Sequence, residues 1–64
     1  MYKVELHTIN NDVIEIITDI HDVVLMTRIE HAIDRKEMLM IRDVNDKEYY
    51  IAGEKILYST IEEF

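Results

Sequence analysis

Apolar and polar residues alternate at the start of the chain. Every second residue from Tyr2 to Leu6 is apolar, and a charged residue stands at each position between them. This period of two is typical of a β-strand with one buried face. The pair Asn10-Asn11 follows, and asparagine accepts the left-handed backbone conformation of tight hairpin turns. Residues 12–18 are rich in β-branched side chains and predict the return strand, so we expect a β-hairpin over residues 2–18.

The spacing of apolar residues becomes helical in the middle of the chain. Asp19 and Asp22 are both favoured N-cap residues, and Arg35-Lys36 places positive charge where the negative end of a helix dipole would lie. We therefore expect a helix that is capped by Asp19 or Asp22 and runs to about Arg35. At about 100° per residue, one face of this helix carries the residues expected to pack on the core. They are Leu25, Met26, Ile29, Ala32 and Ile33.

A second apolar group lies on the opposite side of this helix. One explanation is that the helix begins only at Asp22 and that the residues before it are a linker. The other is that the helix has a second apolar face that needs a partner, because one short helix cannot cover two cores. On the second explanation we expect a self-association surface. It consists of Ile20, Val23, Val24, Thr27 and His31.

Strand patterns return after the helix. Residues 38–41 are apolar at every position, which predicts a central strand covered on both sides, with Met26, Met38 and Met40 filling the core. Asn45-Asp46 predicts a second hairpin turn before a strand over 48–51. A short loop with Gly53 then leads to a last strand over 56–61. The expected fold class is α+β: one domain over residues 1–64, a small antiparallel sheet with one helix packed on it, in the order ββαβββ.

Length and composition limit what can stabilise this fold. A chain of 64 residues buries only about 60% of the surface that it exposes when unfolded. It has no cysteine, which excludes disulfides and thiolate zinc sites. We therefore expect self-association into a dimer or higher oligomer. Since the first residues lead directly into a strand pattern and no apolar run approaches about 20 residues, we expect no signal peptide, no membrane and a cytoplasmic location.

The sequence contains no catalytic motif. Its one glycine excludes glycine-rich phosphate-binding loops, and its one serine, Ser59, stands in a predicted strand. The possible metal ligands between Asp19 and Asp34 include His21 and His31, which would point about 80° apart on a helix. We therefore expect no enzyme, no metal and no cofactor.

The charge balance indicates the kind of partner. The net charge is −7, with 14 acidic and 7 basic residues, which argues against direct binding to nucleic acid. An acidic surface favours encounter with a basic protein surface, although it also keeps a small domain in solution. The expected partner-binding residues are Glu48, Glu54, Glu62 and Glu63.

In composition the chain resembles a known group of proteins. It is short and acidic, is rich in Ile, Asp, Glu and Tyr, and lacks Cys, Pro and Trp. It is similar in these respects to small accessory proteins of Gram-positive phages and prophages. The resemblance implies a protein that binds and blocks a larger host protein, and it assigns no residue. We therefore expect a non-enzymatic protein that regulates or inhibits a larger partner as a homo-oligomer.

Two alternatives stay open. The first is an oligomeric small-ligand protein, in which tyrosines and basic residues at a subunit junction hold a nucleotide-like molecule. The second is a structural subunit of a larger assembly. The residues considered for the first alternative are Tyr49, Tyr50, Tyr58, Arg28, Arg35, Lys36 and Arg42.

Overall fold

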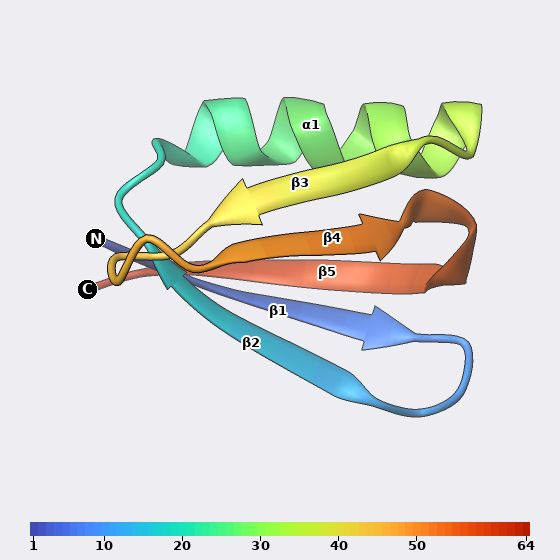
Figure 1. Ribbon diagram of the computed structural model, residues 1–64, viewed down its shortest axis with the longest axis horizontal. Helices are drawn as coiled ribbons and strands as arrows, with labels where there is room; N and C mark the ends of the chain where they lie inside the picture. Colours follow the sequence, from blue (N-terminus) through green and yellow to red (C-terminus); the bar gives the residue numbers. More distant parts are fainter.

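The expected first hairpin is present in the computed structural model, which describes residues 1–64 (Figure 1). Strand β1 (Tyr2–Thr8) pairs with β2 (Val13–Thr18) in an antiparallel register. The N–H of Thr8 donates to the carbonyl of Asp12 at 2.9 Å, and the N–H of Asn11 donates to the carbonyl of Thr8 at 3.1 Å. Asn11 has a φ of 66°, so the asparagine occupies the left-handed position that the turn requires.

Helix α1 (Asp22–Arg35) begins at the later of the two expected positions. His21 is the N-cap residue, and its Nδ1 accepts the N–H of Val23 at 3.3 Å. The carboxylate of Asp22 accepts the same N–H at 2.8 Å, so it satisfies the helix terminus from the first helical position. The predictions of Asp19 and of Asp22 as the N-cap residue were both wrong, and residues 19–21 are a linker. At the other end, Lys36 takes the left-handed conformation, with a φ of 54°.

The second half of the chain also follows the expected order. Strands β3 (Met38–Arg42) and β4 (Glu48–Ala52) form a hairpin whose turn has Asp46 at a φ of 64°. A short 3-10 helix, η1 (Gly53–Lys55), replaces the expected loop. Strand β5 (Ile56–Glu63) is longer than predicted and pairs with β1 rather than with its neighbour in sequence. The predicted α+β class and the order ββαβββ are confirmed.

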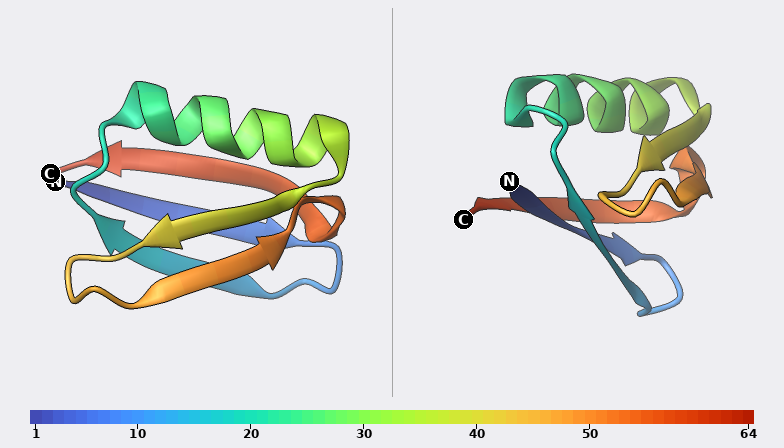
Figure 2. Two further views of the ribbon diagram at one scale, coloured as in Figure 1. Left: turned by 45° about the horizontal axis from the view of Figure 1, so that its top comes forward. Right: turned by 60° about the vertical axis from the view of Figure 1, so that its left-hand side comes forward.

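The strands form two sheets and not one. Sheet A has the order β2-β1-β5, and sheet B consists of β3 and β4. Figures 1 and 2 show that the two sheets and the helix surround the interior from three sides. The core consists of Tyr2, Val4, Leu6, Ile16, Leu25, Ile29, Ala32, Leu39, Ile41 and Ile56.

Two connections hold sheet B against the rest of the molecule. The hydroxyl of Thr18, a fully buried residue, donates to the carbonyl of Arg42 at 2.9 Å and accepts the N–H of Ile20 at 3.2 Å. Beside it, the N–H of Val44 donates to the carbonyl of Ile17 at 3.0 Å. At the other end of sheet B, the N–H of Gly53 donates to the carbonyl of Glu37 at 2.8 Å, a bond that extends the β3–β4 ladder itself.

The expectation that three methionines fill the core was wrong. Met26, Met38 and Met40 have exposed fractions of 51%, 62% and 38%. In β3, only Leu39 and Ile41 point to the core, since sheet B has solvent on its other face. Strand β3 is also an edge strand and not the expected central one.

The first prediction concerns this assignment of faces. Ile41→Asp is expected to unfold the domain, because an unpaired buried carboxylate costs several kcal/mol of a total stability of about 5–15 kcal/mol. The neighbouring variant Met40→Asp is expected to keep the folded circular dichroism spectrum, since Met40 points away from the core. A folded Ile41→Asp protein, or an unfolded Met40→Asp protein, would contradict the assignment.

The second prediction concerns Gly53, which lies under the end of the helix. A Cβ atom on this residue would stand 1.9 Å from the carbonyl oxygen of Ala32 and 2.7 Å from that of Glu37. Gly53→Ala should therefore lower the free energy of unfolding by about 3 kcal/mol, because backbone must move to make room. Urea denaturation measures the change. Lys36→Gly is the control. It should raise the free energy of unfolding by about 1 kcal/mol, because glycine adopts the left-handed conformation of this position without strain.

Candidate interaction surfaces

The backbone hydrogen bonds define which strand edges are free. In an antiparallel pair, hydrogen-bonded and non-hydrogen-bonded residue pairs alternate along the ladder. The N–H of Thr8 donates to the carbonyl of Asp12, so the even-numbered residues of β2 form the hydrogen-bonded pairs with β1. Likewise, the bonds from Asp43 to Lys47 and from Gly53 to Glu37 make the odd-numbered residues of β4 the hydrogen-bonded ones.

It follows that the remaining residues of these strands turn their N–H and C=O groups outward. In β2 they are Val13, Glu15 and Ile17, and in β4 they are Glu48, Tyr50 and Ala52. The carbonyl of Ile17 already accepts the N–H of Val44. No backbone hydrogen bond joins β2 to β4, because the two strands belong to different sheets.

A groove of about 600 Å³ opens between these two free edges, and we call it the edge groove. Val13 and Ile14 line it from β2, and Tyr50, Ile51 and Ala52 line it from β4. Val13 and Tyr50 have exposed fractions of 52% and 63%. The polar residues around it are Thr8, Asn10, Asp12 and Lys55.

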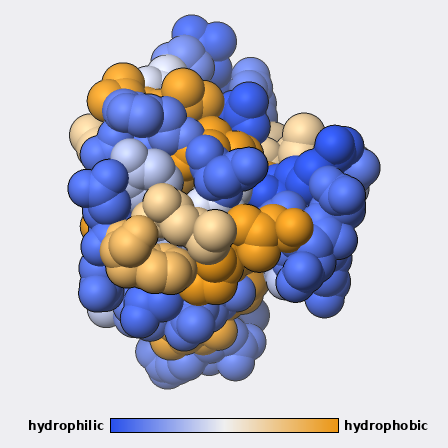
Figure 3. All heavy atoms as spheres, turned by 90° about the vertical axis from the view of Figure 1, so that its left-hand side faces the viewer, coloured by the Kyte–Doolittle hydropathy of each residue, from blue (hydrophilic) through white to orange (hydrophobic).

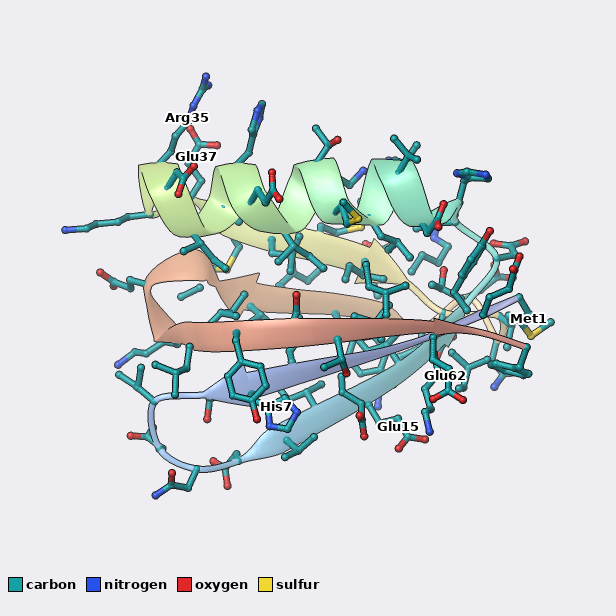
Figure 4. The ribbon with its side chains drawn as sticks, turned by 180° about the vertical axis from the view of Figure 1, so that it is seen from behind. Met1, His7, Glu15, Arg35, Glu37 and Glu62 are labelled. Atoms are coloured by element: carbon teal, nitrogen blue, oxygen red, sulfur yellow. The ribbon has the colours of Figure 1, made fainter.

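A second, smaller groove of about 280 Å³ runs between α1 and β3, and we call it the helix groove. Arg28 and His31 line it from the helix, and Met38 and Met40 line it from the strand. Glu37 lies at the same groove, in the connection after the helix. Figure 4, seen from behind, shows Arg35 and Glu37 together at this end of the helix.

The outer face of sheet B lies between the two grooves and carries a small polar network. Arg42 Nη2 and Glu48 Oε1 are 3.1 Å apart, and the hydroxyl of Tyr50 donates to Glu48 Oε2. Hydrogen bonds from Tyr50 and then from Arg42 lower the pKa of Glu48. The hydrogen bond to Glu48 and the negative charge of Glu48 raise the pKa of Tyr50.

The outer face of sheet A is charged at its centre. Glu5 and Glu15 stand directly opposite each other on β1 and β2, and the hydroxyl of Thr60 donates to Glu5 Oε1 at 3.2 Å. Figure 4 shows Glu15, Glu62 and His7 along this sheet. The ring of His7 stacks on that of Tyr58, with the ring centroids 4.2 Å apart.

A further apolar area covers the end of the molecule where both chain termini lie (Figure 3). The N–H of Phe64 donates to the carbonyl of Met1 at 3.0 Å, and both side chains are more than half exposed. The turn between β3 and β4 reaches the same end, with Val44 exposed on it (Figure 1). Nearby, burial first and the carboxylates of Asp22 and Glu63 second raise the pKa of Tyr2.

The structure separates the expected self-association residues. Val23, Val24, Thr27 and His31 are exposed on α1, and the hydroxyl of Thr27 donates to the carbonyl of Val23 at 2.9 Å. Ile20 lies outside the helix, is half-buried and packs against the core. It therefore does not share a surface with the other four.

The four expected partner-binding acids do not form one surface. Glu48 lies on sheet B, and Glu54 lies in η1. Glu62 and Glu63 are consecutive in β5, so their side chains point to opposite faces of sheet A, and Glu62 Oε2 is 3.8 Å from Lys3 Nζ. The sequence pattern missed Glu5 and Glu15, which only the strand register brings together.

The tyrosines are also separated. Tyr49 is half-buried against the core, with its hydroxyl donating to Asp43 Oδ2 at 3.4 Å and Lys47 Nζ 5.0 Å from its ring centroid. Tyr50 points outward from the same strand, and Tyr58 lies on sheet A. Of the basic residues considered for a ligand, Arg28 is the one that lines a groove together with His31.

Nowhere do three His, Asp or Glu side chains gather so that they could share a metal ion. His21 Nδ1 lies 2.9 Å from Asp22 Oδ1 at the start of the helix. Helix α1 is neither long enough nor apolar enough to span a membrane. In comparisons with known proteins, no family model, no curated protein and no solved structure matches this chain.

The third prediction concerns the pKa of Tyr50. Glu48→Gln removes the negative charge that holds the phenol in its protonated form, so the pKa of Tyr50 should fall toward its ordinary value. Glu63→Gln is the matched control, which should lower the pKa of Tyr2 and leave Tyr50 unchanged. Titration of the tyrosine ring signals by nuclear magnetic resonance measures both values. An unchanged Tyr50 in the Glu48→Gln protein would show that the two side chains do not interact in solution.

Proposed function

We propose that this chain is a non-enzymatic protein-binding module that self-associates through α1 and β3 and regulates or inhibits a larger protein with a basic surface. The observation that carries the proposal is the exposed apolar surface at the helix groove, where Met38 and Met40 of β3 and His31 of α1 line the groove. We call these three residues, together with Val24, which is exposed on the same helix, the apolar strip. Val24 precedes Arg28 by one turn on the same side of the helix.

The amount of exposed apolar surface supports this proposal. Large hydrophobic side chains that are exposed number 13, whereas the core cluster has 10 residues. Scattered exposed hydrophobic residues are normal on protein surfaces, but contiguous ones are typical of interaction sites. Met38 and Met40 line the same groove and alternate with core residues along β3, so a second copy could cover them together with the outer face of sheet B.

The arrangement of acids supports a basic partner. Glu5 and Glu15 face each other across two strands, and like charges in directly opposite positions destabilise a sheet. A lysine or arginine from a partner would relieve this repulsion. The net charge of −7 would speed the encounter with such a partner and make its rate depend on salt. The compositional likeness to phage accessory proteins agrees with a role of this kind.

The fourth prediction tests self-association. The protein should be a dimer or higher oligomer at micromolar concentration by light scattering. Val24→Glu and Met40→Glu should each produce a monomer with an unchanged circular dichroism spectrum, because both place charge in the strip. The matched control is Val13→Glu, which adds the same charge at an exposed position of sheet A and should leave the oligomer intact. A monomeric wild-type protein would remove the self-association part of the proposal.

The partner is tested with protein captured from cells and then purified. Binding of the purified partner should be fast at low salt and slower as the salt concentration rises. Glu5→Lys with Glu15→Lys should slow association. Glu54→Lys makes the same change of charge at one position in η1, under the helix C-terminus, and serves as the control that should slow association less. Equal association of wild type and the double variant at both low and high salt would contradict a basic partner surface.

A small-ligand function is the second candidate, and one observation favours it. Arg28 and His31 line the helix groove together, so two groups able to bind an anion share one concave surface. On this alternative, a second copy would close the groove over a nucleotide-like molecule. Native mass spectrometry distinguishes the two functions, because a retained small molecule would add its mass to the oligomer, and Arg28→Ala would remove it.

A further inference from the structure

The edge groove lies between two strand edges that are unpaired and unprotected. The outward N–H and C=O groups of Val13 border it on the β2 side, with those of Glu15 next along the same strand edge, and those of Tyr50 and Ala52 border it on the β4 side. Proteins protect free edges with proline, lysine, bulges or a covering element. The outward positions of β4 have no proline, lysine or bulge, and Glu48 is the one charged residue among them. Strands β3 and β5, in contrast, both lie along the helix.

The space between the edges suits an extended chain. A volume of about 600 Å³ is enough for a few residues, and Ile14 and Ile51 provide an apolar floor. In an added strand, successive side chains would alternate between this floor and the outer surface. The backbone of the added strand would meet N–H and C=O groups that have no partner in the free protein.

Charge determines which extended chain fits. Asp12 lines the groove, and Glu15 stands two positions after Val13 on the outer face of β2. On β4, the carboxylate of Glu48 accepts the hydroxyl of the groove residue Tyr50 and also pairs with Arg42. Lys55 is the basic residue among those that line it. An occupant therefore meets more negative than positive charge, which favours basic side chains at its outward positions.

We infer that the edge groove binds a short extended segment of the partner protein, in which basic side chains alternate with apolar ones, by adding it as a strand to the edge of β4. This inference rests on the proposed function and names how the basic partner is recognised. The apolar side chains enter the groove over Ile14 and Ile51. The basic side chains lie toward Glu15 and Glu48.

Ala52 allows a sharp test of the backbone contact. Its φ is −65°, which is the value that proline imposes, and its N–H faces away from β3. Ala52→Pro therefore removes one outward donor of the β4 edge without a change in backbone conformation. Ala52→Val is the matched control, because it adds a side chain of similar size and keeps the N–H.

The fifth prediction uses a blocked Lys-Val-Lys-Val-Lys peptide as the probe. In a nuclear magnetic resonance titration, the peptide should shift the backbone amide signals of Val13, Glu15, Tyr50 and Ala52. Ala52→Pro should weaken its binding at least about tenfold, which corresponds to the loss of about 1.4 kcal/mol. Ala52→Val should bind within about twofold of wild type. A Glu-Val-Glu-Val-Glu peptide should bind much more weakly than the basic one.

Three outcomes would overturn the inference. The basic peptide could leave the edge-groove amides unshifted, the acidic peptide could bind equally well, or Ala52→Pro could bind as tightly as wild type. Protection of the Tyr50 and Ala52 amides from hydrogen exchange in the free protein would also overturn it, since the edge would then be paired already. In each of these cases the proposed function would still stand if the wild-type protein is an oligomer and Val24→Glu makes it a monomer. The failure of this inference can therefore be distinguished from the failure of the proposed function.

Discussion

The fold depends on one buried side-chain hydrogen bond, from the hydroxyl of Thr18 to the carbonyl of Arg42. No backbone ladder connects sheet A to sheet B, so the hydrogen bonds that join the two sheets are this one and the Val44–Ile17 bond. Thr18 also accepts the N–H of Ile20 and so sets the direction in which the chain enters the linker to α1. Replacing the hydroxyl by an apolar group would leave the carbonyl of Arg42 and the N–H of Ile20, both of them in partly buried hydrogen bonds, without this partner, which costs more than the bond contributes.

The same arrangement produces the candidate sites. If β2 and β4 were joined along their length, the sheets would form one continuous surface and no edge would remain between them. Instead the strands meet at the Thr18 end and diverge toward Val13 and Ala52, where the edge groove opens. The helix covers the opposite side, so the edges of β3 and β5 run along it. The position of the grooves is thus a consequence of where the few connections between the sheets lie.

Local features were predictable from the sequence, and pairings between distant segments were not. The turns at Asn10-Asn11 and Asn45-Asp46 were predicted at the right places. Both are three-residue loops that place Asn11 and Asp46 in the left-handed conformation. The strand register therefore differs by one residue from the register that a two-residue turn would give. That single residue decides that Glu5 faces Glu15. The pairing of β5 with β1, and the exposure of Met38 and Met40, follow from tertiary packing. An uninterrupted apolar run is compatible with a strand buried on one face or on both.

The small size of the domain explains why many of its apolar residues are exposed. A domain this small has a limited interior, and its apolar residues exceed what the core can contain, so several remain on the surface. Exposed apolar surface promotes indiscriminate association, while the net charge of −7 opposes it through repulsion between copies. A binding event that covers the strip and also supplies positive charge is favoured by both effects. Selectivity for basic partners can therefore arise from the balance of charge and apolar exposure, in a chain that has no specialised motif.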